Sequence, residues 1–211
     1  MDPVDAWNSE AHVFDEAADH GLSDPAVRGA WQELLASVLP HPPCRIADLG
    51  CGTGTLTLLL AEQGHTVDGV DFAPRMVERA RNKASNHQAV SIYEGDAFAP
   101  PLPAATYDAV VCRHVLWMSP DPVDSLSRWV RLLNPRGRLV IIEGLWSTGT
   151  GLTANQTVAW VQAIGRRAET RTLTDPQLWG RPITDERYLL LSPPGDEPAR
   201  WRYSSARTPR S

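Results

Sequence analysis

Three short motifs place glycine and acidic residues directly after consecutive predicted strands. The first is the segment 48–54, which reads Asp-Leu-Gly-Cys-Gly-Thr-Gly. The second is Asp71, and the third is Asp96 in the run Gly95-Asp96-Ala97. Open α/β sheets bind ligands outside the carboxyl ends of their strands, where glycines allow close backbone approach and an acid accepts hydrogen bonds from a ribose diol. Since Asp96 adds an acceptor for the exocyclic amine of a base, the series indicates a site for a nucleoside without phosphates.

The glycine spacing differs from two common phosphate-binding loops. The dinucleotide fingerprint needs a third glycine where this sequence has Thr55, and the segment lacks the Lys-Ser/Thr ending of a P-loop. Each motif also has a plainer interpretation. Glycine suits any tight turn, Asp71 can cap a helix that begins near Pro74, and Asp96 can belong to an ordinary turn.

Alternating strands and helices must position these motifs. Strands are predicted over 45–49, 66–70, 90–93, 107–112 and 138–142, and helices over 24–39, 55–63, 74–84, 123–133 and 153–167. This alternation predicts an α/β fold, with a doubly wound, mainly parallel sheet and helices on both faces. Two weaker edge strands are expected over 170–173 and 188–191.

The predicted organisation is one structural domain with three parts. Residues 1–43 are expected to form an N-terminal helical cap or lid, and residues 44–192 the ligand-binding core. Residues 193–211, rich in Pro, Arg and Ser, are expected to form a flexible tail.

Composition and charge narrow the class of protein. The 211 residues carry a formal net charge of -5, which argues against binding the phosphates of nucleic acid. The apolar stretches fall far short of a membrane span, the acidic start does not resemble a signal peptide, and three cysteines are too few for a disulfide framework. We therefore expect a cytoplasmic monomer or homodimer with a small-molecule substrate and no nucleic-acid or membrane partner.

At these motifs the sequence resembles the class I S-adenosylmethionine-dependent methyltransferases, specifically the small bacterial type 11, ubiquinone-methyltransferase-like enzymes. The resemblance is carried by 48–54, by 70–76 (Val-Asp-Phe-Ala-Pro-Arg-Met) and by 107–114 (Tyr-Asp-Ala-Val-Val-Cys-Arg-His), and it covers roughly residues 7–192. It implies a Rossmann-like fold, S-adenosylmethionine as cofactor and S-adenosylhomocysteine as product. The cofactor-binding residues expected on this basis are Asp48, Gly50, Cys51, Gly52, Gly54, Asp71, Phe72, Met76, Asp96, Ala97 and Arg113.

Two histidines are candidates for proton transfer. Methyl transfer needs a general base when the acceptor must lose a proton, as a hydroxyl must. His114 follows the fourth strand, beside the place where the resemblance puts the methyl donor, and His20 lies in the N-terminal lid next to Asp19. The alternatives are a helix-capping role for His114 and an ordinary surface turn for His20.

Aromatic residues indicate a flat substrate. Trp7, Phe14, Trp117 and Trp146 are expected at the substrate entrance, and Trp179 could complete the enclosure. Trp31, Trp129 and Trp160 lie on apolar helical faces and are expected in the core. Arg113 suits the cofactor carboxylate or an anionic substrate, and its alternative is a surface salt bridge.

The predicted function is methyl transfer to an oxygen or nitrogen of a small aromatic or heterocyclic metabolite. No metal is expected, because Glu143 is the only acidic residue available after the fourth and fifth strands. The alternatives are a non-catalytic S-adenosylmethionine-binding partner subunit and an NAD-dependent oxidoreductase. Thr55 at the third fingerprint glycine and the lack of a Tyr-x-x-x-Lys pair disfavour the oxidoreductase.

Overall fold

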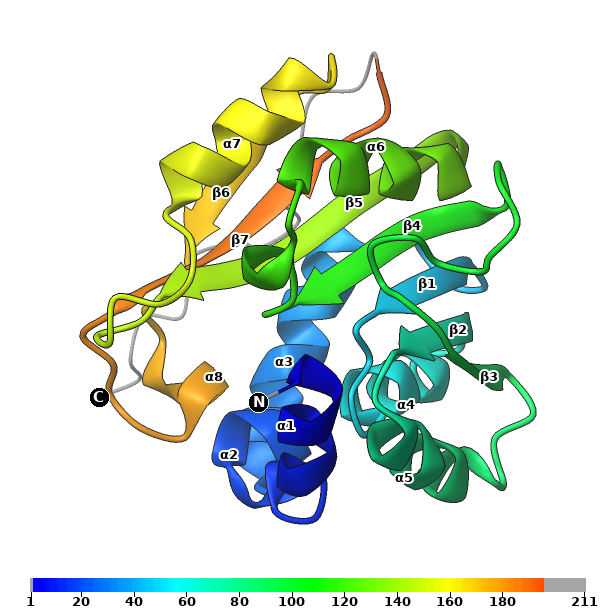
Figure 1. The fold of residues 1–211 in the computed structure, drawn as a ribbon, viewed down its shortest axis with the longest axis vertical. Coiled ribbons are helices and arrows are strands. Elements are labelled where there is room, and N and C mark those ends of the chain that lie inside the picture. The colour runs from blue at the N-terminus through cyan, green and yellow to red at the C-terminus, as the bar shows by residue number, and fades with distance from the viewer. Residues whose placement is uncertain (1, 196–211) are drawn as a thin grey trace, which may run out of the picture.

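A computed structural model describes residues 2–195 and places seven strands in one mixed sheet (Figure 1). The strands are β1 (Arg45–Leu49), β2 (Thr66–Asp71), β3 (Val90–Glu94), β4 (Tyr107–Arg113), β5 (Leu133–Leu145), β6 (Glu169–Thr172) and β7 (Glu186–Ser192). Their order across the sheet is β3-β2-β1-β4-β5-β7-β6. Strands β1 to β5 pair in parallel, whereas β7 pairs antiparallel with β5 and β6. The expected mainly parallel, doubly wound sheet is confirmed.

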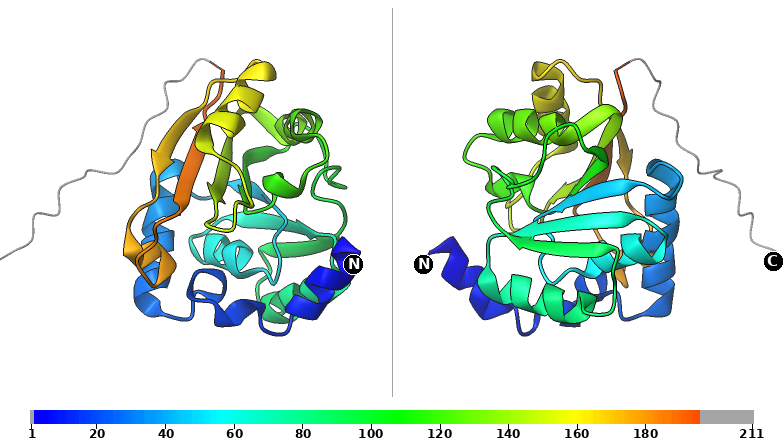
Figure 2. Two further views of the ribbon diagram at one scale, coloured as in Figure 1. Left: turned by 60° about the vertical axis from the view of Figure 1, so that its left-hand side comes forward. Right: turned by 90° about the vertical axis from the view of Figure 1, so that its right-hand side faces the viewer.

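Helices cover both faces of this sheet, as Figures 1 and 2 show. They are α1 (Pro3–Glu10), α2 (Ala18–Gly21), α3 (Pro25–Val38), α4 (Thr55–Glu62), α5 (Pro74–Ala84), α6 (Pro122–Leu132), α7 (Ala154–Ala163) and α8 (Pro176–Trp179), with short 3-10 turns η1 (Phe14–Glu16) and η2 (Leu116–Met118). One apolar core lies between the sheet and α3, α4 and α8, and the other between the sheet and α6 and α7. Helix α5 packs against β2 and β3.

Alternation along the strands supplies both cores, because successive side chains of a strand point to opposite faces. In β5, Val140 and Ile142 join the α3–α4 core, and Leu139 and Ile141 join the α6–α7 core. All four side chains are fully buried. The β1–β5 segment therefore holds the carboxyl ends of its strands at one rigid edge.

Helix starts follow ordinary capping chemistry. Asp24 accepts the backbone N–H of Ala26 at the start of α3, and Pro25 takes the first helical position. Thr153 and Gln156 form a reciprocal capping box at the start of α7. The predicted helices are confirmed, with ends shifted by a few residues.

The prediction of two edge strands is wrong for β7, which lies inside the sheet between β5 and β6. Because β7 runs antiparallel to β5, its first residues meet the carboxyl end of β5, and Arg187 pairs with Gly144. A segment late in the chain thereby reaches the edge where ligands bind in open α/β sheets.

The segment predicted as an N-terminal cap or lid contacts the rest of the domain through its helices. Helix α1 lies beside α5, and the backbone N–H of Arg75 donates to Oδ1 of Asn8 at 3.0 Å (Figure 2). Helix α3 packs directly on the sheet through residues such as Trp31.

Of the tail expected from residue 193, only 193–195 lie within the described residues. Pro193 is buried, and its carbonyl accepts a hydrogen bond from Arg166. No helix within residues 2–195 is long and apolar enough to span a membrane.

Candidate active site

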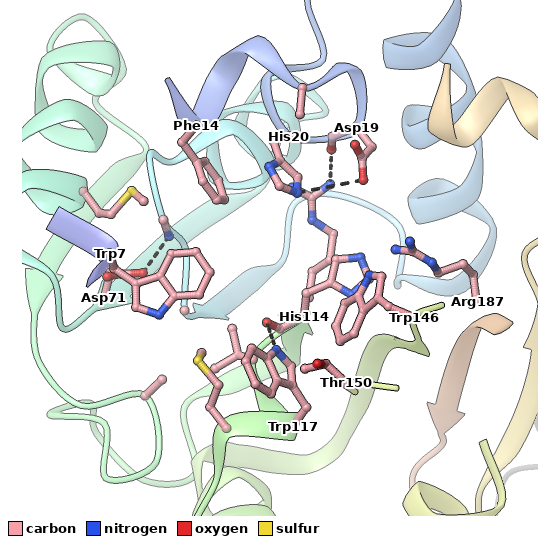
Figure 3. A pocket seen from close by; sticks show the side chains of 18 of the residues that line it. Trp7, Phe14, Asp19, His20, Asp71, His114, Trp117, Trp146, Thr150 and Arg187 are labelled. Atoms are coloured by element: carbon pink, nitrogen blue, oxygen red, sulfur yellow. Dashed lines mark hydrogen bonds and ion pairs between the residues drawn. The ribbon is translucent and has the colours of Figure 1, made fainter. Parts of the chain in front are cut away.

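A cavity of about 600 Å³ opens at the carboxyl ends of the parallel strands (Figure 3). Most of the residues predicted for the site line it, and they come from the lid, the glycine loop and the ends of β2, β3, β4 and β5. These residues are Trp7, Phe14, His20, Gly50, Gly52, Asp71, Phe72, Met76, Asp96, Ala97, Arg113, His114, Trp117 and Trp146. The cavity therefore joins the predicted cofactor, base and aromatic positions in one space.

The glycine loop brings backbone to the wall of the cavity. Gly50 and Gly52 have φ values of 72° and 54°, a left-handed conformation that glycine adopts without strain. A Cβ on Gly50 would also lie 2.2 Å from Cγ2 of Val115. Both the left-handed φ and the lack of space for a Cβ therefore require glycine at position 50.

Asp71 ends β2 and lines the same wall. Its Oδ2 accepts the backbone N–H of Gly52 at 2.8 Å, and its Oδ1 accepts that of Ala73 at 2.9 Å. Burial raises the pKa of this carboxyl above its ordinary value, although the backbone donors oppose the rise. A carboxylate accepts about four hydrogen bonds, so Asp71 keeps capacity for two further donors.

Asp48, Cys51 and Gly54, which were also predicted to contact the cofactor, do not line the cavity. Asp48 is buried and accepts the hydroxyl of Thr57 at 2.5 Å, so it ties β1 to α4. Burial raises the pKa of Asp48 to about 6. Cys51 is also buried, and Gly54 has a φ of 79° at the start of α4, where a Cβ would lie 3.0 Å from Cβ of Ala80. All three residues support the conformation of the loop on the side away from the cavity.

Arg113 ends β4 with its guanidinium at the cavity wall. It lies over the ring of Trp31, 5.0 Å from the ring centroid, and donates to the backbone carbonyl of Asp19 at 2.6 Å. Within residues 2–195, no carboxylate lies within ion-pair distance of Arg113, which excludes the surface salt bridge. Arg113 thus keeps a positive charge available for an anionic group.

His114 follows Arg113 in a left-handed conformation, with a φ of 59° that is uncommon for residues other than glycine. Its ring lies 5.2 Å from that of Trp146 between centroids. Both ring nitrogens are enclosed and lack a hydrogen-bond partner among the described residues, so the helix-capping alternative is not observed. Burial, with Arg113, Arg187 and His20 nearby, holds the pKa of His114 well below its ordinary value.

Glu143 on β5 was considered in the sequence only as a metal ligand, and the structure places it beside His114. Its side chain is fully buried, and Oε1 accepts the backbone N–H of Trp117 at 3.4 Å. Oε2 lies 3.8 Å from Nδ1 of His114 and lacks a partner among residues 2–195. Burial raises the pKa of Glu143 to about 8. Within residues 2–195, no group of three or more His, Cys, Asp or Glu side chains is placed to hold a metal ion.

Aromatic rings line the far side of the cavity. The rings of Trp117 and Trp146 lie 5.9 Å apart at 73°, and Nε1 of Trp117 donates to the carbonyl of His114. Arg187 lies between the rings of Trp146 and Trp179, at 5.3 and 4.9 Å from their centroids. Trp179 itself does not line the cavity, so the enclosure that it was expected to complete is formed without it.

The lid covers the opposite side. Phe14 stacks on His20 with ring centroids 4.3 Å apart, and Trp7 meets Phe14 edge to face. Asp15 accepts the hydroxyl of Thr53 at 2.5 Å and forms an ion pair with Lys83 at 2.6 Å. The lid is therefore fastened to the glycine loop and to α5.

The lining residues that were not predicted include a polar group from late in the chain: Ser147, Thr148, Thr150, Arg181, Asp185 and Arg187. They follow β5 or precede and begin β7. Arg187 donates twice to Asp185, at 3.2 and 2.9 Å. The direction of β7 brings Arg181, Asp185 and Arg187 here, and the short apolar run of that strand did not reveal its direction.

Comparison with known proteins finds a methyltransferase domain in the chain. Residues 47–141 match the family model described as a methyltransferase domain. The chain is 38% identical over 119 residues to a demethylmenaquinone methyltransferase of Deinococcus radiodurans, covering 55% of this chain and 49% of that protein. It is 34% identical over 136 residues to the nocamycin O-methyltransferase of Saccharothrix syringae, covering 60% of this chain and 48% of that protein. The chain contains a methyltransferase domain. It spans about half the length of these two relatives.

A solved structure agrees with the fold of the methyltransferase. The S-adenosylmethionine-dependent methyltransferase of Aquifex aeolicus superposes with a TM-score of 0.66 at 17% identity, covering 88% of this chain and 97% of that one. This likeness shows the fold, and the cavity fits S-adenosylmethionine, the cofactor that the sequence resemblance implies. Gly50 and Gly52 leave room for close approach, Asp71 and Asp96 offer carboxylates to hydroxyl and amine donors, and Arg113 offers a cation to a carboxylate.

Proposed function

We propose that this methyltransferase moves the methyl group of S-adenosylmethionine to an oxygen or nitrogen of a small, flat aromatic or heterocyclic molecule. The observation that carries the proposal is the continuity of the cavity. One space runs from the glycine loop and Asp71, past His114, to the rings of Trp117 and Trp146. A flat acceptor held by these rings lies beside the donor site, which supplies the proximity that methyl transfer needs.

The cofactor half of the cavity orients the donor. Asp71 would accept both ribose hydroxyls, Asp96 with the backbone of Ala97 would hold the adenine amine, and Arg113 would pair with the methionine carboxylate. Phe72 and Met76 would pack on the adenine ring. When bound, S-adenosylmethionine supplies a methyl group on a positively charged sulfur, and the electrons of the broken carbon–sulfur bond stay on sulfur.

The acceptor half handles the proton. The acceptor oxygen or nitrogen forms the new bond to the methyl carbon as its own proton leaves. His114 would take this proton, because its enclosed ring nitrogens lack other partners in the described chain and its low pKa keeps the imidazole neutral at neutral pH. His20, the second candidate base, stacks on Phe14 in the lid and would help to enclose the donor.

Two measurements test the proposal. Isothermal titration with S-adenosylmethionine, S-adenosylhomocysteine and NADH should show micromolar affinity for the two adenosyl ligands only. Incubation with methyl-labelled S-adenosylmethionine and a panel of phenols and N–H heterocycles should then label at least one acceptor. Binding of NADH alone would instead favour the oxidoreductase, and binding without any transfer would favour a non-catalytic subunit.

A histidine variant tests the proton acceptor. His114→Ala should keep its affinity for S-adenosylmethionine and lose at least about 100-fold in transfer rate, the usual contribution of a general base. His41→Ala is the matched control, because His41 is exposed before β1 at the opposite end of the strands. Equal rates for the wild type and His114→Ala would remove His114 from the mechanism.

A further inference from the structure

The carboxyl group of Glu143 and the imidazole of His114 form an enclosed pair with unused hydrogen-bonding capacity. Oε2 of Glu143 and both ring nitrogens of His114 are buried, and none of the three atoms has a hydrogen-bond partner within residues 2–195. Leaving such an atom unpaired destabilises the fold, so buried polar atoms without partners call for an explanation. Oε2 lies 3.8 Å from Nδ1, less than 1 Å beyond the usual range of a hydrogen bond.

The backbone holds this carboxyl group in place. Glu143 lies near the carboxyl end of β5, and its neighbours Ile142 and Gly144 pair with β4 and β7 on either side. Oε1 accepts the backbone N–H of Trp117 in the turn that follows β4. The backbone N–H of His114 in turn donates to the carbonyl of Ile142 at 2.9 Å, which fixes the two residues relative to each other.

We propose that Glu143 is the positioning residue for His114 in the proposed methyl transfer. Its carboxylate accepts the Nδ1–H of His114, so that the lone pair of the imidazole is on Nε2 and is available to the acceptor. This assignment rests on the proposed function, and it names how the base of that reaction is prepared. Both nitrogens of the ring then have partners when the acceptor is bound: Glu143 for Nδ1, and the acceptor hydroxyl or N–H for Nε2.

Charges around the ring make this partner necessary. Arg113 from β4, Arg187 from β7 and His20 from α2 all disfavour a positive charge on His114. Glu143 from β5 is the carboxylate within ion-pair distance of the ring. When Nε2 takes the acceptor proton, the imidazolium is stabilised by the Glu143 carboxylate through Nδ1–H. The proton then leaves from Nε2 after the methylated product departs, which returns the imidazole to its starting tautomer.

Ionisation of Glu143 should therefore switch the base on. Its pKa of about 8 means that the carboxyl is mostly protonated at pH 6.5 and ionised at pH 9. A protonated Glu143 would donate to Nδ1 and place the imidazole proton on Nε2, where it blocks proton uptake. The tautomer of His114 is thus expected to change between these two pH values.

The experiment is ¹⁵N NMR of the full chain saturated with S-adenosylhomocysteine, at pH 6.5 and pH 9. Two-bond ¹H–¹⁵N correlations distinguish the two tautomers, and the His114→Asn spectrum assigns the signals. At pH 9 the wild type should show the Nδ1–H tautomer. Glu143→Gln should lose the change between the two pH values, while Asp68→Asn, a buried carboxylate elsewhere on the sheet, should leave it unchanged.

Each result decides one hypothesis. An Nε2–H tautomer in the wild type at pH 9, or an unchanged pH response in Glu143→Gln, would overturn the role of Glu143 even if S-adenosylmethionine binds normally. Failure of the wild type to bind either adenosyl ligand would instead overturn the proposed function. With a labelled acceptor in hand, Glu143→Gln should lower kcat about 10- to 100-fold at pH 9 with little change in KM for S-adenosylmethionine.

Discussion

Gly52 donates its backbone N–H to Oδ2 of Asp71 at 2.8 Å, and this bond joins the glycine loop to the end of β2. One carboxylate thereby fixes the shape of the loop and still faces the cavity. Oδ1 of Asp71 also accepts a backbone N–H, that of Ala73. Both carboxylate oxygens therefore act as hydrogen-bond acceptors, and neither can be replaced by a hydrogen-bond donor without losing one of these contacts.

Asp71→Asn should therefore weaken binding of S-adenosylmethionine by at least about tenfold, since an amide nitrogen would meet a backbone donor or a ribose hydroxyl at one of these positions. Isothermal titration measures the change. Asp68→Asn is the control, because Asp68 is a buried carboxylate on the same strand and does not line the cavity. Equal losses in both variants would show that Asp71 acts only through stability.

The contacts of Asp15 with Thr53 and Lys83, which fasten the lid to the glycine loop and to α5, give a second prediction. Burial raises the pKa of Asp15, but hydrogen bonds from Lys83 and Thr53 outweigh burial and leave the pKa below its ordinary value. Asp15→Ala removes both partners' contacts, so the lid should open more often and affinity for S-adenosylmethionine should fall about 3- to 10-fold. Asp5→Ala, an exposed change in α1 of the same lid, should not alter affinity. If Asp15→Ala binds S-adenosylmethionine as tightly as the wild type does, the contacts of Asp15 do not control the opening of the lid.

The sequence revealed the cavity residues at the ends of β2 and β3 more readily than those that β7 contributes. The glycine loop, Asp71 and Asp96 follow directly from strand ends, and local chemistry determines each of them. Arg187 could not be found this way, because its place depends on the antiparallel insertion of β7 between β5 and β6. That pairing is a long-range choice, and the short apolar run of β7 is compatible with either direction and either position in the sheet.

The pairing of Glu143 with His114 was missed for a related reason. The parallel register between β4 and β5 aligns Arg113, the last residue of β4, with Ile142, and the residues that follow these two in the chain are His114 and Glu143. Both residues were visible in the sequence, but their proximity needs the register of two strands joined by a helix. Asp48 differs from the other acidic motif residues, because its carboxyl accepts the hydroxyl of Thr57 inside the fold and does not line the cavity.

The buried carboxyl of Glu143 also makes a prediction about stability. A carboxyl whose pKa is raised in the folded state, from 4.5 to about 8, retains a proton that the unfolded chain releases. Its contribution to stability is present in full below about pH 4.5 and is lost as the pH rises through 8. Glu143→Gln cannot titrate, so its Tm relative to the wild type should increase by several degrees between pH 5 and pH 9. Thermal unfolding across this range measures the difference, and a constant offset would contradict the raised pKa.

The aromatic side of the cavity gives the last prediction. Trp146 packs on His114 and Trp117, and Arg187 supports its ring from the other side. Trp146→Leu keeps an apolar side chain but removes the flat surface, so KM for a flat acceptor should rise about tenfold, while affinity for S-adenosylmethionine should stay within about twofold. Trp160→Leu is the matched control, because Trp160 is half-buried on α7 and does not line the cavity. A fall in S-adenosylmethionine affinity with unchanged acceptor KM would place Trp146 on the donor side instead, and the flat acceptor would then have to bind against Trp117 alone.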